Sequence, residues 1–218
     1  MIVLSFLPFF LFFLACKKEE ESIKKDPTGS IIITAFGASI VQGDKDNNFE
    51  DSLQVFLAQT LKTPVTVYNR GIGGQTTRDG LARIKKTLDE TRPDYTLITL
   101  GTNDALLATT FSTPLTETYN NMDAILATCL KNNTKPILSS LTGVDTLKRD
   151  LPLRKNLKLV NTAYEQIARK YGIPFLDLDT PLSGHSDFFN SDGIHLNAKG
   201  YQVVALEWHN IISKSTGR

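Results

Sequence analysis

Short apolar stretches alternate with longer segments of helical periodicity along most of this 218-residue chain. The apolar stretches are rich in aliphatic and β-branched residues, and five of them predict strands: 31–36, 65–69, 95–100, 136–141 and 175–178. Their nearly continuous apolar character is typical of parallel strands that helices cover on both faces.

Between and after these strands, apolar residues recur every three or four positions, as they do on one face of a helix. The pattern predicts five helices, over 49–61, 81–88, 122–130, 157–168 and 205–212. Alternating strands and helices of this length require parallel strands joined by right-handed crossovers, so we expect a three-layer α/β/α sandwich around a five-stranded parallel sheet. Ligands bind beyond the carboxyl ends of the strands in such sheets.

The N-terminus has a different pattern. Its first fifteen residues are almost all apolar and end at Cys16, which a charged segment follows. The run is shorter than the roughly 20 residues that cross a bilayer, so it predicts a cleaved signal peptide over 1–15. Phe13-Leu14-Ala15-Cys16 resembles a bacterial lipoprotein processing site, at which Cys16 becomes lipidated. We expect an exported protein anchored in the cell envelope, in the periplasm or at the outer membrane; a secreted protein and an uncleaved anchor are the alternatives.

Residues 16–29 are polar, lack aromatics and predict a tether, which leaves one domain over 30–218. Lys and Arg number 24 against 23 Asp and Glu, a formal net charge of +1, so no global field recruits nucleic acid or an anionic membrane. We therefore expect a small-molecule partner, no nucleic acid, and membrane contact only through the anchor at Cys16. The second cysteine, Cys129, lies on a predicted amphipathic helix as a small buried hydrophobe.

The first predicted strand ends in Gly37-Ala38-Ser39-Ile40, which puts a serine at its carboxyl end. Gly-x-Ser after a strand is by itself weak evidence, because it often only makes a turn or caps a helix. Val41 occupies the second glycine position of a Gly-x-Ser-x-Gly elbow, which disfavours an α/β-hydrolase.

Two further loops follow the second and third strands. The segment 69–77 contains Gly71, Gly73 and Gly74, but Thr76 replaces the third glycine of a dinucleotide fingerprint and no phosphate-loop lysine follows, so a nucleotide cofactor is disfavoured. The third strand ends in the segment 101–104, where the carboxamide of Asn103 either closes a turn or serves as a donor to an oxyanion.

The fourth polar loop precedes the last predicted helix and contains Asp192 and His195. Their spacing brings the carboxylate beside one ring nitrogen and leaves the other for a proton on the substrate side. His185 and Asp187 lie nearby in sequence, but the four residues match no metal-ligand pattern, so we expect no metal site here.

Taken in order, the four loops resemble the sequence blocks of the SGNH (GDSL-like) hydrolase family. The segments 67–83 and 97–104 are especially similar to its bacterial thioesterase/lysophospholipase and arylesterase branch. The resemblance implies a flavodoxin-like strand order, Ser39 as nucleophile, and Asp192 with His195 as its base system. It further implies an oxyanion hole formed by the backbone N–H groups of Ser39 and Gly74 and the side chain of Asn103, with no cofactor.

The implied activity is hydrolysis of a carboxylic ester through an acyl-enzyme, with a short acyl ester, a lysophospholipid or an acyl thioester as substrate. A carbohydrate O-acetylesterase of the same fold is an alternative. A non-catalytic binding lipoprotein is another, because Ala38 stands where the family usually has an aspartate before the serine. Leu196 replaces a proline that commonly follows the histidine, a departure of less consequence.

Overall fold

The computed structural model describes residues 29–44 and 47–216. The predicted signal peptide, Cys16 and most of the predicted tether therefore lie outside the described residues, and these assignments stay predictions. None of the helices in the described part is both long and apolar enough to cross a membrane.

The predicted five-stranded parallel sheet is confirmed. Its strands are β1 (Ile31–Gly37), β2 (Val65–Gly71), β3 (Tyr95–Thr99), β4 (Lys135–Ser139) and β5 (Phe175–Leu176). They pair in the order β2-β1-β3-β4-β5, every pair parallel, which is the flavodoxin-like order. The expected strand over 175–178 is shorter than predicted, because only its first two residues pair with β4.

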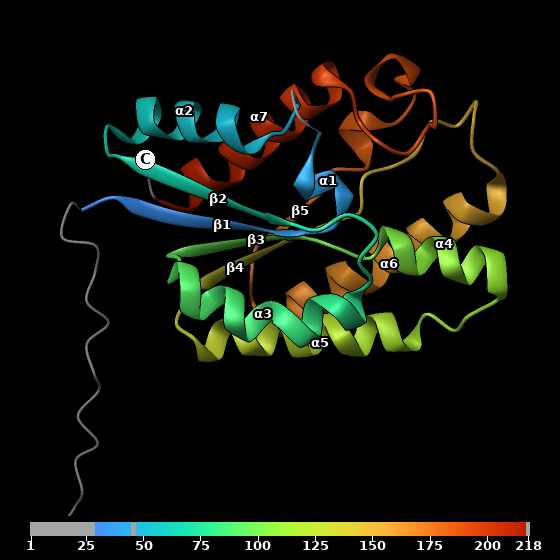
Figure 1. Ribbon diagram of the computed structural model, residues 1–218, viewed down its shortest axis with the longest axis horizontal. Coiled ribbons are helices and arrows are strands. Elements are labelled where there is room, and N and C mark those ends of the chain that lie inside the picture. Colours follow the sequence, from blue (N-terminus) through green and yellow to red (C-terminus); the bar gives the residue numbers. More distant parts are fainter. Residues whose placement is uncertain (1–28, 45–46, 217–218) are drawn as a thin grey trace, which may run out of the picture.

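Helices cover both faces of the sheet, as Figure 1 shows. One face carries α2 (Glu50–Leu61) and α7 (Ala198–Ser215); the other carries α3 (Thr77–Thr91), α5 (Thr116–Lys131) and α6 (Leu151–Tyr171). Side chains of β1 alternate between the two cores: Ile33 and Ala35 pack beneath α2 and α7, whereas Phe36 packs against the other layer. The three-layer α/β/α prediction is therefore confirmed.

The sequence pattern missed α4 (Thr102–Phe111), which directly follows β3. Only Ala105 is buried among its ten residues, so the segment has no apolar stripe to reveal a helix. The short elements α1 (Ser39–Gln42), η1 (Thr180–Leu182) and η2 (Ser186–Phe188) complete the described secondary structure. Figure 1 shows α1 and α4 at the carboxyl ends of the strands.

Candidate active site

Ser39 is the first residue of α1, immediately beyond the end of β1. Gly37 makes this sharp turn possible, since a Cβ atom there would lie 2.2 Å from the carbonyl oxygen of Thr99 and 2.4 Å from Cγ2 of Val41. Only glycine permits such a close approach of two backbones. The N–H of Ser39 belongs to the first helical turn and so has no acceptor within the helix.

Asp192 and His195 lie in the loop before α7, where the structure brings them into direct contact. Nδ1 of His195 is 2.5 Å from Oδ2 of Asp192, while Oδ1 of Asp192 accepts the backbone N–H groups of Ile194 and His195 at 2.9 and 3.0 Å. Partial burial acts to raise the pKa of Asp192, but these hydrogen bonds outweigh burial and lower the pKa to about 2. Asp192 is therefore ionised at neutral pH.

The structure also joins this pair to the serine, 156 residues away in sequence. Nε2 of His195 is 2.9 Å from Oγ of Ser39, within hydrogen-bonding distance. The hydroxyl of Ser39, the imidazole of His195 and the carboxylate of Asp192 are thus connected in sequence by hydrogen-bonding contacts at the carboxyl edge of the sheet. The predicted juxtaposition of Ser39, His195 and Asp192 is present.

Two residues before α6 hold the loop that contains Asp192. Nε of Arg149 donates to the carbonyl oxygen of Asp192 at 2.7 Å, and the N–H of Asp145 donates to that of Gly193 at 2.9 Å. The side chain of Asp145 also accepts the hydroxyl of Ser186 at 2.7 Å, which lowers the pKa of Asp145. Nothing in the local sequence distinguished these contacts, because they join segments about forty residues apart.

The glycine loop after β2 lies against the serine. A Cβ atom on Gly73 would come within 4.0 Å of Cβ of Ser39, and the N–H of Gly73 donates to Oε1 of Gln42 at 2.9 Å. Gly74 follows with φ +77°, and its N–H has no acceptor among the described residues. Nδ2 of Asn103 donates to the carbonyl oxygen of Gln75 at 2.8 Å, so the third predicted loop is tied to the second.

Arg83 of α3 connects these loops, and the sequence assigned it no role. Its Nη2 donates to the carbonyl oxygen of Gly37 at 2.9 Å, its Nε donates to Oε1 of Gln75 at 2.6 Å, and the guanidinium lies 4.0 Å over the ring of Phe36. Burial lowers the pKa of Arg83 to about 10. In sequence it resembles the exposed lysines of the same helix, so no local pattern could have singled it out.

A cavity of about 260 Å³ opens beside the serine and histidine. Both polar and apolar groups line it, and the lining residues are Ser39, Gln42, Gly43, Asp44, Asn190, Asp192, His195, Leu196 and Tyr201. In the described part of the chain no three His, Cys, Asp or Glu side chains are grouped to hold a metal ion. His185, weighed as a ligand from its sequence position, instead stacks on Phe188.

This fold, with a serine, a histidine and an aspartate in one hydrogen-bonded row at the carboxyl edge of the sheet, is the arrangement of SGNH-type serine hydrolases. The chain belongs to the GDSL-like lipase/acylhydrolase family, whose model matches residues 35–203. The family resemblance inferred from the four loops is therefore confirmed.

Three comparisons illustrate this relationship. An arylesterase of Vibrio mimicus is 55% identical over 42 residues, which are 19% of this chain and 21% of that protein. The thioesterase 1/protease 1/lysophospholipase L1 of Escherichia coli K12 is 26% identical over 148 residues, which are 67% of this chain and 66% of that protein. The match to this chain therefore covers less than two thirds of the arylesterase and of the thioesterase. The crystal structure of the lipase/acylhydrolase from Enterococcus faecalis superposes with a TM-score of 0.71 at 24% identity, covering 85% of this chain and 96% of that one.

Proposed function

We propose that the protein hydrolyses carboxylic esters, with Ser39 as nucleophile, His195 as general base and Asp192 as the group that orients the imidazole. The observation that carries the proposal is the 2.9 Å contact between Ser39 Oγ and His195 Nε2, continued by the contact between His195 and Asp192. Activation of a serine requires a base within hydrogen-bonding reach, itself oriented by a third group.

The ionised state of Asp192 decides which nitrogen of His195 is the base. A carboxylate can only accept hydrogen bonds, so Nδ1 must be the nitrogen that donates to Asp192. Nε2 is then left with a lone pair and accepts the hydroxyl proton of Ser39. The site is thus set in the tautomer that base catalysis needs.

In the proposed reaction, Ser39 Oγ bonds to the ester carbonyl carbon while His195 takes the hydroxyl proton. The N–H groups of Ser39 and Gly74 and the carboxamide of Asn103 stabilise the resulting oxyanion. His195 then gives its proton to the departing alkoxide, which leaves an acyl-enzyme. A water molecule attacks this intermediate with the same base, releasing the acid and restoring the hydroxyl.

Ala38 does not weaken the proposal, because the side-chain row is complete without a carboxylate at that position. The methyl group of Ala38 is buried in the core beside Phe36, with 6% of the residue exposed. A non-catalytic binding protein would have no need of a serine hydrogen-bonded to an oriented histidine. The geometry therefore favours catalysis over the binding alternative.

Short acyl esters, lysophospholipids and acyl thioesters fit the proposed chemistry. A second candidate is an acetyl ester of a carbohydrate, since the carboxamides of Gln42 and Asn190 line the cavity and can hydrogen-bond sugar hydroxyls. Initial rates on p-nitrophenyl esters of increasing chain length, compared with an acetylated sugar, would separate the two candidates.

Ser39→Ala tests the nucleophile. It should lower kcat on p-nitrophenyl acetate by on the order of 10⁶-fold, by analogy with serine proteases, and abolish labelling by a fluorophosphonate. Ser52→Ala is the matched control, because Ser52 lies on α2 and contacts Gln202 rather than the site. Hydrolysis by Ser39→Ala at the parent rate would remove the assignment.

We also propose, from the sequence alone, that the protein is exported and attached to the cell envelope through Cys16. Cys16→Ala should then release the protein from the membrane fraction and abolish incorporation of radiolabelled fatty acid. Labelling of Cys16→Ala equal to that of the parent would contradict the anchor.

A further inference from the structure

Large apolar side chains are exposed on two segments near the candidate active site. Phe111, Leu147 and Leu151 are 72%, 84% and 70% exposed, the three highest values among large apolar residues in the described part of the chain. All three belong to segments that follow the carboxyl ends of β3 and β4. Exposed apolar side chains gathered at one place, unlike scattered ones, mark an interaction surface.

The segments that carry these side chains also contain residues that form or support the candidate active site. Leu107 and Phe111 lie four and eight residues beyond Asn103, so the three share one face of α4. In the segment after β4, Leu147 precedes Lys148 and Arg149, which donate to the carbonyl oxygens of Asn190 and Asp192 in the histidine loop.

The two exposed segments are also held together. Asn156 of α6 donates to the hydroxyl of Thr109 on α4 at 2.9 Å. Figure 1 shows α4 beside the first turns of α6, beyond the carboxyl ends of the strands. Apolar side chains from both segments therefore border the same end of the molecule.

The charge of this region differs from that of the whole chain. Between residues 146 and 164 there are five basic residues and one acidic residue, whereas the chain as a whole carries a net charge of +1. The acidic residue, Asp150, is occupied as the N-cap of α6. Arg154 and Lys155 are exposed, form no ion pair among the described residues, and lie one turn beyond Leu151 on the same face of α6.

Together these residues form an apolar–basic rim, made up of Phe111, Leu147, Lys148, Leu151, Arg154 and Lys155. We propose that the apolar–basic rim binds the surface of an anionic phospholipid membrane and so turns the mouth of the site toward lipid. Basic side chains attract anionic headgroups, and neighbouring apolar side chains enter the boundary between headgroups and acyl chains. A nucleic acid or an acidic protein would satisfy the charges alone, whereas a lipid surface also accounts for the exposed leucines and phenylalanine.

The proposal concerns binding and does not depend on hydrolysis, so it is tested in full-length Ser39→Ala, which cannot alter the lipid. Amide hydrogen exchange is measured by mass spectrometry with vesicles of phosphatidylcholine alone and with vesicles containing phosphatidylglycerol. Local protection is the readout rather than total binding, because the proposed lipid anchor at Cys16 is the same in every variant and would bind each of them to vesicles. We expect protection of 107–113 and 146–159 on the anionic vesicles only.

Two variants separate the charge from the apolar contribution. In the double variant Arg154→Glu with Lys155→Glu, the ratio of vesicle-protected to unprotected rim segments should fall by at least about 25-fold. Each basic residue near an anionic surface contributes roughly fivefold to the binding constant, and two are removed. Leu147→Ser with Leu151→Ser should also reduce protection, without changing hydrolysis of p-nitrophenyl acetate in a Ser39 background.

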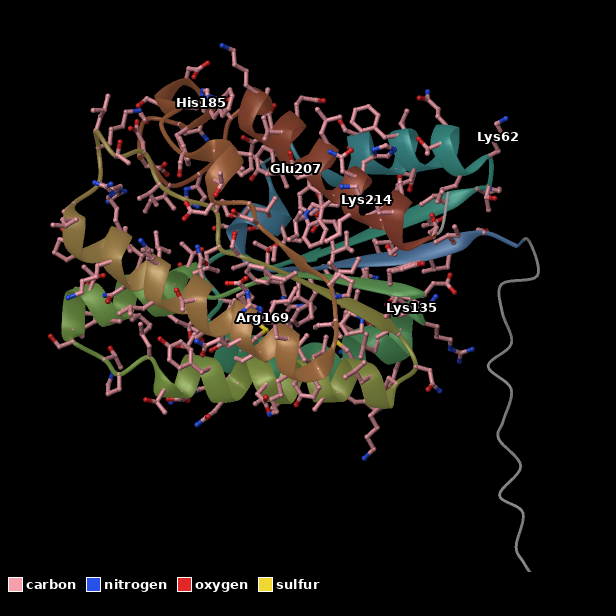
Figure 2. The ribbon with its side chains drawn as sticks, turned by 180° about the vertical axis from the view of Figure 1, so that it is seen from behind. Lys62, Lys135, Arg169, His185, Glu207 and Lys214 are labelled. Carbon is pink, nitrogen blue, oxygen red and sulfur yellow. The ribbon has the colours of Figure 1, made fainter. Side chains whose placement is uncertain are left out.

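The control variant is Lys62→Glu with Lys214→Glu, an equal change of charge at the opposite end of the molecule from the start of α6 (Figure 2). It should leave protection of the rim intact. Equal protection on neutral and anionic vesicles, or protection that survives the charge reversal of Arg154 and Lys155, would overturn the proposal. If dextran sulfate protects the rim and this protection persists in the double variant Leu147→Ser with Leu151→Ser, the ligand of the rim is an acidic polymer rather than lipid. That result would also overturn the proposal.

Discussion

Asn103→Ala should lower kcat for ester hydrolysis by roughly 10²- to 10³-fold, because it removes one donor from the proposed oxyanion hole. The structure shows how one carboxamide can act twice. Nδ2 of Asn103 carries two hydrogens, of which one is directed to the carbonyl oxygen of Gln75. The second N–H is the one available to a developing oxyanion.

The same substitution removes the hydrogen bond to Gln75, which should lower the free energy of unfolding by about 1 kcal/mol. Asn156→Ala is a matched control, since Asn156 makes a comparable 2.9 Å bond to Thr109 on α4 without facing the serine. Both variants should lose similar stability in chemical denaturation, but only Asn103→Ala should lose activity. This separates catalysis from support of the loop.

Asn103→Asp sharpens the test, because it keeps the shape of the side chain and replaces the donor with a negative charge. It should be slower than Asn103→Ala, with kcat falling more than KM changes. Steady-state kinetics on p-nitrophenyl acetate would measure both constants. A kcat for Asn103→Ala within threefold of the parent, in a protein as stable as Asn156→Ala, would refute the role of Asn103 in binding the oxyanion.

Two further predictions concern ionisable groups. Asp192→Asn should lower kcat by up to roughly 10⁴-fold, because an amide at this position allows the wrong tautomer of His195. The thermal unfolding temperature of the variant should stay close to that of the parent. An Asp192→Asn variant with the activity of the parent would contradict the orienting role. Glu50 is 2% exposed, its carboxyl oxygens have no hydrogen-bond partner among the described residues, and burial raises its pKa from 4.5 to about 8. Because the folded pKa is the higher one, the contribution of Glu50 to stability is present below pH 4.5 and is lost as pH rises to about 8. Glu50→Gln should therefore gain on the order of 5 kcal/mol in free energy of unfolding relative to the parent across that pH window, measured by urea unfolding. A difference that does not change with pH would contradict the buried, protonated carboxyl.

The sheet could be predicted from sequence because each of its strands is an apolar run bounded by polar or glycine-rich loops. Residue Ser39 could be found for a related reason. The turn that contains Ser39 and Gly37 follows a strand that is buried on both faces, and parallel strands bring all their carboxyl ends to one edge. The pairing of Asp192 with His195 was accessible too, since the two residues are only three positions apart.

The support of the site could not be read in the same way. Arg83 and Arg149 act through backbone carbonyl oxygens, which every residue has and no sequence pattern marks. α4 was missed because its outer face carries Leu107 and Phe111, exposed side chains that blur any amphipathic pattern. An apolar side chain that serves a surface rather than the core removes the signal on which helix prediction depends.

The two halves of the proposed reaction centre rest on separate supports. Ser39 depends on Gly37, whose carbonyl oxygen is fixed by Arg83, and on the Gln42 contact with Gly73. His195 depends on a different set, in which Arg149 holds the carbonyl oxygen of Asp192. Only the 2.9 Å contact between Ser39 Oγ and His195 Nε2 joins the two side chains directly. Small displacements of either support are therefore enough to separate nucleophile from base, and activity should be far more sensitive than stability to changes in these positioning residues.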